Sequence, residues 1–296
     1  KDKNGNILVN FRDCNLHLIS YSEPIHQYFA FDELKEHLHY DLELPESIPY
    51  RTTYYKRDWG FCVNEAQYTA LSLADAPLEV MIDVEFDSNG SMTVGELLIP
   101  GKLEQEILIS TYICHPSLAN DNLSGLIVTA LLAREMVSRD KPNKSWRFIF
   151  VPETIGSIAY LCHNEAVMKK MSGGLVVTTC GGPGLFGYKE THMGNHLVDR
   201  AIQLAFRDRG ITPLHYPFAP DGSDERQYSS PAFRIPVATI TRDKYYEYPE
   251  YHTSADNLDF VSGRQISETL EIYRDVVQII EQNVYYCSKA THGEVQ

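Results

Sequence analysis

The sequence has no apolar run of about 18 residues, which argues against a transmembrane helix. It also has no CxxC pair, since its 6 cysteines are scattered, and this excludes zinc-ribbon and thioredoxin-like motifs. Positive charge is scarce, because 26 Lys and Arg residues stand against 40 Asp and Glu residues, for a net charge of -14. We therefore expect this chain to bind neither nucleic acid nor an anionic membrane.

The first residues, KDKNGN, lack the apolar core of a signal peptide. We therefore expect free thiols, a reducing cytoplasm as the location, and a chain that begins inside a longer protein. The length of 296 residues suits one large domain, or one domain with a sizeable insertion, and allows an ample core. The 19 Tyr residues suit clefts and interfaces, and a homo-oligomer is left open.

Residues 1–100 differ in texture from the rest and are predicted to form a small β-rich domain, with a strand returning to the core. The alternating segment at 80–84 indicates an antiparallel strand. A turn signal at 87–90 precedes a further strand near 92–99.

Residues 101–288 alternate between strand and helix patterns, and residues 289–296 form a polar tail. Such alternation predicts an α/β domain whose mainly parallel sheet carries helices on both faces. The expected strands are 106–113, 147–151, 174–179 and 235–241, and the expected helices are 123–137, 157–170, 194–208 and 263–284.

The first residues that could carry chemistry are His115 and Asp121, in the segment STYICHPSLANDNLSG. This segment follows a strand pattern and precedes a helix pattern, so both residues belong to a loop at the carboxyl edge of the sheet, where ligands usually bind. Imidazole nitrogen and carboxylate oxygen are both zinc ligands. The alternative is that Asp121 or Asn122 only caps the following helix.

Glu153 stands directly after the apolar strand pattern at 148–151, again at a carboxyl edge. A carboxylate in this place can act as a general base toward a metal-activated water. The alternative is an acidic residue at a helix start, which the helix dipole favours.

His252 lies in EYPEYHTSADNLDFV, close to Asp256 and Asp259. Histidines that bind metals commonly donate their second ring N–H to a carboxylate, so these neighbours suit a ligand. The alternative is a surface histidine in a loop.

A compact charged group, Asp224, Glu225 and Arg226, follows a turn at Gly222. An arginine beside a cleft can hold a substrate carboxylate through two parallel hydrogen bonds, so we assign these three residues to substrate binding. The alternative is a solvated loop with local ion pairs, which add little stability.

In this order, the four segments resemble the zinc-dependent aminopeptidases of metallopeptidase family twenty-eight. That family has a loop His, an Asp in a D-[DN]-x-S-G segment, a Glu after a strand, an S-D pair before a G-I-P-like strand, and a Y-H-T-x-x-D segment. This chain supplies His115, Asp121-Asn122-Leu123-Ser124-Gly125, Glu153, Ser223-Asp224 with Ile235-Pro236, and Tyr251-His252-Thr253 with Asp256. This match covers roughly residues 104 to 285.

The segments CHPSLANDNLSG, VPETIGSIAYL and GSDERQY further resemble a bacterial aminopeptidase-like branch that is associated with polysaccharide biosynthesis. So do NLHLISYSEP and IPYRTTYYKRDWGFC, which extend the resemblance over nearly the whole chain. It implies a zinc-exopeptidase-like fold with an inserted β-rich domain beside the cleft. Members are usually longer at both ends, commonly with a winged-helix-like module after the peptidase-like domain.

The chain departs from the two-zinc pattern of the family at two ligand positions. Thr154 stands where the family has a ligand Glu, and Thr179 or Cys180 stands near its ligand Asp. The remaining set, His115, Asp121 and His252, suits one zinc ion with an open position.

The resemblance therefore implies an aminopeptidase-like hydrolase of amide bonds in a small peptide or amide, with Glu153 as the base that returns a proton to the leaving amine. Two alternatives stay open. One is a deacylase or amidohydrolase that acts on a modified sugar or a peptide conjugate. The other is a binding module without catalysis, although such a module has no need of Glu153.

Overall fold

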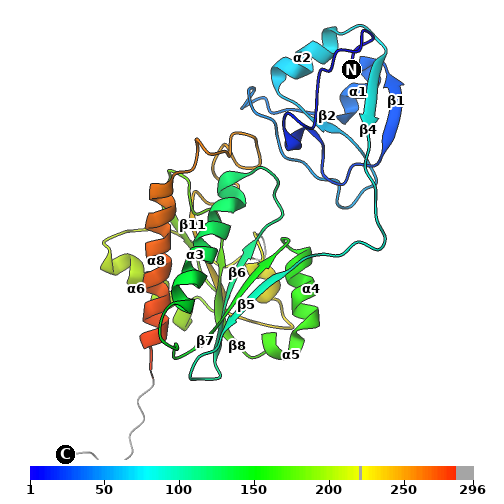
Figure 1. The fold of residues 1–296 in the computed structure, drawn as a ribbon. Coiled ribbons are helices and arrows are strands. Elements are labelled where there is room, and N and C mark those ends of the chain that lie inside the picture. Colours follow the sequence, from blue (N-terminus) through cyan, green and yellow to red (C-terminus); the bar gives the residue numbers. More distant parts are fainter. Residues whose placement is uncertain (220–221, 285–296) are drawn as a thin grey trace, which may run out of the picture.

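The computed structural model describes residues 1–219 and 222–284. The predicted tail at 289–296, the last residues of the predicted 101–288 domain and Cys287 lie outside the described residues. A small N-terminal domain sits beside a larger α/β domain, and one long connection joins them (Figure 1). No helix of the described part combines the length and hydropathy that crossing a membrane requires.

The α/β domain is built on one seven-stranded sheet in the order β10-β9-β11-β8-β6-β7-β5. Most neighbours are parallel; β5 runs antiparallel to β7, and β9 runs antiparallel to β11. This arrangement confirms the predicted fold class. The strands are β5 (Gly95–Ile99), β6 (Glu106–Tyr112), β7 (Ser145–Val151), β8 (Met171–Val177), β9 (Phe186–Lys189), β10 (Leu214–Tyr216) and β11 (Val237–Arg242).

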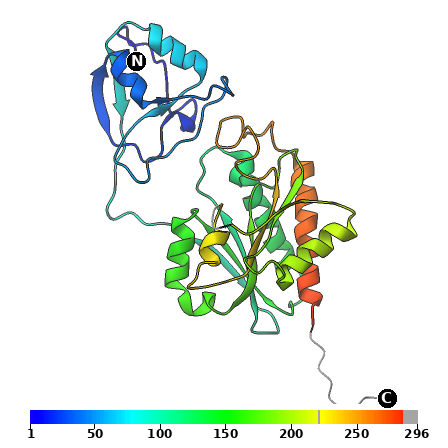
Figure 2. The same ribbon diagram turned by 180° about the vertical axis from the view of Figure 1, so that it is seen from behind.

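Both faces of the sheet are covered because successive strand residues point to opposite faces. In β6, Ile107 and Ile109 join one core and Leu108 joins the other. Helices α3 (Gly125–Val137), α6 (Leu197–Asp208) and α8 (Gly263–Gln282) cover the first face. Helices α4 (Ile155–His163), α5 (Glu165–Met168) and α7 (Glu225–Tyr228) cover the second (Figure 2).

The N-terminal domain holds two small sheets around a core that includes Leu34, Val63 and Leu78. One pairs β1 (Ile25–Phe29) antiparallel with β4 (Leu78–Ile82), as the alternation at 80–84 predicted, and the other pairs β2 (Leu38–His39) parallel with β3 (Phe61–Cys62). The helical elements are η1 (Asn15–His17), α1 (Phe31–Leu34), η2 (Lys35–His37) and α2 (Glu65–Leu73). The strand expected near 92–99 is β5, at the edge of the large sheet.

A short contact ties the two domains together next to the loop that carries His252. The backbone N–H of Tyr50 donates to the carbonyl of His252 over 2.6 Å. Two residues on, Ser254 exchanges hydrogen bonds with Ile48, each 2.8 Å long. The N-terminal domain therefore helps to fix the position of His252.

Candidate metal and catalytic site

The loop after β6 carries His115 and ends in a π-helical turn, η3 (Ala119–Ser124), in which Asp121 is fully buried. The next residue, Asn122, anchors this turn to the ends of two strands. Its amide donates to Thr111 Oγ1 over 2.9 Å and to the carbonyls of Tyr112 and Val177, both over 3.2 Å. Asn122 thus fixes the backbone of this turn, and the Asp121 side chain faces the site.

Asp121 is held on two sides. The carboxylate of Asp256 accepts the backbone N–H groups of Asn120 and Asp121, over 2.5 and 3.0 Å. The Tyr112 hydroxyl donates to Asp121 Oδ1 and also lies 2.6 Å from Thr178 Oγ1. One carboxylate oxygen of Asp121 is therefore used by a tyrosine, and only Oδ2 faces the histidines.

His115 and His252 converge on that second oxygen. The distances from Asp121 Oδ2 to His115 Nδ1 and to His252 Nε2 are both 3.1 Å. All three atoms are buried without a hydrogen-bond partner. The ligand atoms lie within 4.8 Å of one another, close enough to share a metal ion. The structure thus brings the three predicted ligands together, although His252 is more than 130 residues away from the other two in the sequence.

The electrostatics of this cluster favour ionised groups. Burial alone would raise the pKa of the Asp121 carboxyl, but the His115 and His252 imidazoles outweigh burial and hold it well below its usual range. Burial alone would lower the pKa of His115, yet the carboxylates of Asp121 and Glu153 raise it well above its ordinary value. The Asp121 carboxylate thus favours a positive charge beside it, either a proton on His115 or a metal ion that replaces this proton, because a histidine ligand is neutral.

Aromatic rings surround the two imidazoles. The Tyr251 ring stacks on His252 with a centroid separation of 3.9 Å. Tyr50, from the N-terminal domain, meets both rings edge to face, at 5.4 Å from His115 and 5.1 Å from His252. These contacts restrict the rotation of both imidazoles.

Glu153 lies at the carboxyl end of β7, facing the same cluster. Its Oε2 is 3.4 Å from His115 Nε2, and its Oε1 accepts a 2.7 Å hydrogen bond from Ser223. The following residue, Thr154, has a φ of 62°, a conformation that is rare for a β-branched residue and typical of functional sites. Thr154 N–H donates to Asp224 over 2.7 Å, which fixes the turn that presents Glu153.

The predicted substrate-binding trio divides into two buried residues and one cleft residue. Asp224 and Glu225 are fully buried, and their carboxylates bind neighbouring polar groups of the protein. Asp224 also accepts from the Ser157 hydroxyl over 2.8 Å, and Glu225 pairs with Lys189 over 2.9 Å. Arg226 alone lines the cavity described next, so only Arg226 is placed to touch a substrate.

A cavity of about 670 Å³ contains Glu153, His115, His252 and Arg226 in its wall. Tyrosines from both domains form much of the remaining wall: Tyr21, Tyr50, Tyr54, Tyr55, Tyr112, Tyr245, Tyr246 and Tyr251. The candidate site therefore opens into a tyrosine-rich cleft between the domains.

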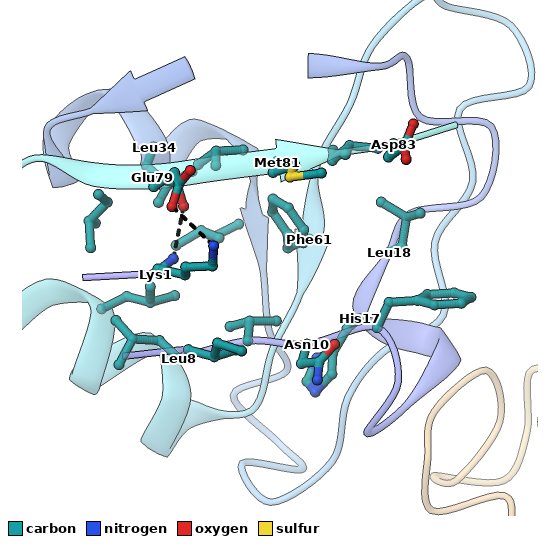
Figure 3. Close-up of a pocket in the computed structure, with 18 of the residues that line it drawn as sticks. Lys1, Leu8, Asn10, His17, Leu18, Leu34, Phe61, Glu79, Met81 and Asp83 are labelled. Atoms are coloured by element: carbon teal, nitrogen blue, oxygen red, sulfur yellow. Dashed lines mark hydrogen bonds and ion pairs between the residues drawn. The ribbon is translucent and has the colours of Figure 1, made fainter. Parts of the chain in front are cut away.

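A second cavity, of about 510 Å³, lies within the N-terminal domain (Figure 3). Its wall is mostly apolar, and some of its polar groups already have partners. His17 Nδ1 bonds to the Cys62 carbonyl over 2.7 Å, and Lys1 pairs with Glu79 over 3.3 Å. Since the clusters of metal-ligating side chains found among the described residues lie at the tyrosine-rich cleft, we place the candidate functional site there.

The two positions at which the chain departs from the two-zinc pattern carry no ligand to the cluster. Cys180 is fully buried, its thiol lies 3.4 Å from the Thr178 carbonyl, and burial raises its pKa, so the thiol stays protonated. Cys114 does approach His115 and Glu153 closely enough to form a second ligand group. However, its sulfur already accepts the Glu153 N–H over 3.2 Å, and burial raises its pKa.

Asp224 should make stability depend on pH. Burial, reinforced by the Glu153 carboxylate, raises the pKa of Asp224 from 3.8 to about 7. Between these values the folded protein holds a proton that the unfolded chain has lost, so this residue's contribution to stability falls as pH rises, by up to about 1.4 kcal/mol per pH unit. Asp224→Asn keeps the shape but does not titrate. In urea unfolding with chelator present, the free energy of unfolding of Asp224→Asn should therefore rise relative to that of the wild type as pH increases from about 4 to 7.

The matched control for this prediction is Asp140→Asn, at an exposed carboxylate. It should leave the pH dependence of the unfolding midpoint unchanged. An unaltered slope in Asp224→Asn would show that Asp224 is already ionised in the folded protein.

Several residues of the site were not assigned a role from the sequence. They are Tyr112, Ser223, Tyr50 and Tyr251. The sequence holds one indication that Tyr112 lies near the site, because Tyr112 ends the strand that precedes His115. Tyr50 offered none, since it comes from the other domain.

The fold of this chain is similar to that of solved aminopeptidase structures. The zinc aminopeptidase BSAP from Bacillus subtilis superposes with a TM-score of 0.63 at 17% identity, over 81% of this chain and 62% of that chain. At this identity the likeness shows the fold alone, which is that of the aminopeptidases.

Closer relatives then define the family. A Clostridium acetobutylicum protein, described as a polysaccharide biosynthesis protein with an aminopeptidase-like domain, is 40% identical over 97% of this chain and 65% of its own length. A crystal structure described as a peptidase from the same organism matches with a TM-score of 0.91 at 40% identity, over 96% of this chain and 66% of that chain. The chain therefore spans about two thirds of the length of these relatives. It belongs to the family described as a domain of unknown function, DUF4910, whose model matches residues 32–283.

Proposed function

We propose that this chain is a hydrolase of amide bonds that uses one zinc ion. The observation that carries the proposal is the set of three buried atoms without hydrogen-bond partners, His115 Nδ1, His252 Nε2 and Asp121 Oδ2. Two imidazoles and one carboxylate are a common ligand set of catalytic zinc. These three residues would hold the ion.

A single ion fits this set better than two ions do. A carboxylate that binds one metal ion through each of its oxygens needs both of them, but Asp121 Oδ1 accepts the Tyr112 hydroxyl. In the two-zinc pattern that the chain resembles, a second ion needs a Glu and an Asp, and this chain has Thr154 and Thr179 or Cys180 near those positions.

When bound, a zinc ion acidifies water and polarises a carbonyl group. Glu153 would accept the proton of the attacking water; its carboxylate, which faces His115 and accepts a hydrogen bond from Ser223, supports this role. As the carbon–nitrogen bond breaks, Glu153 gives this proton to the leaving amine. The hydroxyl of the water stays on the carboxylic acid product, and the proton leaves with the amine. Tyr50 and Tyr251 pack against the His252 imidazole and hold it in position.

The proposal is tested by hydrolysis of a panel of simple amides, namely aminoacyl amides, dipeptides and N-acyl amino acids. The zinc-loaded protein should cleave at least one of these classes, and a chelator should abolish the cleavage. Zinc binding without cleavage of any class would instead favour a binding module on this fold.

A further inference from the structure

The charges around the cleft do not suit a substrate with a free ammonium group. Among the described residues that line the cavity, Glu153 is the only one with a carboxylate, whereas Arg51 and Arg226 both carry a positive charge. Glu153 is already engaged by Ser223 and faces His115. No other lining carboxylate of the described chain is left to hold an α-amine.

Arg226 is short of partners. Its Nε is buried and makes no hydrogen bond, and its Nη2 reaches only Thr154 Oγ1, at 3.5 Å. No acidic residue in the described ranges forms an ion pair with it. A guanidinium nitrogen that is buried and unpaired is costly, and the planar fork of arginine matches a carboxylate.

The short helix that carries Arg226 is anchored on both sides of this residue, which fixes the backbone from which the guanidinium extends. On one side of Arg226, Glu225 pairs with Lys189 over 2.9 Å. On the other side, the buried Tyr228 hydroxyl lies 2.8 Å from Ser110 Oγ in β6. An anchored backbone and a buried Nε leave fewer degrees of freedom to be lost when Arg226 binds an anion.

Arg226 is also close to the reacting groups, because its contact residue, Thr154, directly follows Glu153. An anion that pairs with Arg226 would therefore lie beside the amide bond that is cleaved with Glu153 as the base. Arg51, on the side of the N-terminal domain, adds a second positive charge to the same wall.

We propose that the cleft selects amides that carry a carboxylate next to the scissile bond, such as N-acyl amino acids or the C-terminal residue of a peptide. Arg226 holds this carboxylate. A free α-ammonium group, which an aminopeptidase recognises, is disfavoured. The inference rests on the proposed function for the cleavage, but the binding preference stands on the cleft itself.

The test measures binding of three probes to the zinc-loaded Glu153→Gln variant, so that turnover does not interfere. The probes are N-acetyl-Ala-Ala, which has only the carboxylate, Ala-Ala-amide, which has only the ammonium, and N-acetyl-Ala-Ala-amide, which has neither. The acid should bind about tenfold or more tightly than either amide, as charge-assisted hydrogen bonds imply. Adding Arg226→Met should remove this advantage, and Arg226→Lys should keep part of it.

The matched control is Arg207→Met, at an exposed arginine on α6 whose ion pair is with its own neighbour, Asp208. It should leave all three affinities unchanged. Zinc content and thermal midpoint establish that each Arg226 variant is folded. Tighter binding of Ala-Ala-amide, or an equal loss for all probes in Arg226→Met, would overturn the inference. Preference for the acid without any hydrolysis contradicts only the proposed function, and hydrolysis without that preference contradicts only this inference.

Discussion

Replacing Glu153 with Gln should lower the rate of amide hydrolysis by roughly 10²- to 10⁴-fold, the usual contribution of a general base. Gln keeps the shape of the side chain and can still accept the Ser223 hydrogen bond, which is 2.7 Å long in the native protein. It cannot take a proton from water. Zinc content should therefore stay the same, and the loss should appear in kcat.

The control for this variant is Glu104→Gln, which changes an exposed glutamate before β6. Its activity should equal that of the native protein. If Glu153→Gln retained full activity, or lost activity only together with its zinc, Glu153 would not be the base.

Removal of a single ligand imidazole should abolish zinc binding. In His115→Ala and in His252→Ala the ion would keep two of its three ligands. Loss of a residue that only hydrogen-bonds to a ligand lowers metal affinity by roughly 10- to 100-fold. Loss of the ligand itself should lower the affinity for zinc by more than this. Zinc at 100 times its Kd should stabilise the native protein by about 2.7 kcal/mol, and should add almost nothing to either variant. The measurement is the free energy of unfolding with and without zinc.

His163→Ala is the matched control, because His163 is exposed at the end of α4. Its response to zinc should equal that of the native protein. A full zinc response in His115→Ala would mean that the ion binds elsewhere, for example through surface histidines.

The architecture of the α/β domain could be predicted because its hydrophobic pattern is strong. The strand expected at 106–113 is β6, and the helix expected at 263–284 is α8. The helix expected at 157–170 was predicted as one element, but the structure divides it into α4 and α5 at Asn164. Both pieces keep apolar residues on the core side, so periodicity alone could not reveal the break.

The site was only partly predictable. His115, Asp121 and Glu153 follow strands, and carboxyl ends of parallel strands share one edge, so their proximity could be expected. The burial of Asp224 and Glu225 could not, because their partners, Thr154 N–H and Lys189, are remote in the sequence. Nor does the sequence reveal that Tyr112 uses one oxygen of Asp121.

The central claim is that three ligands hold a single zinc ion, and counting zinc atoms per chain tests it most directly. The purified protein would be equilibrated with zinc, dialysed against metal-free buffer and analysed by atomic emission. The account predicts one zinc per chain, with loss of that zinc in His115→Ala and His252→Ala. Two zinc atoms per native chain, or none, would contradict it.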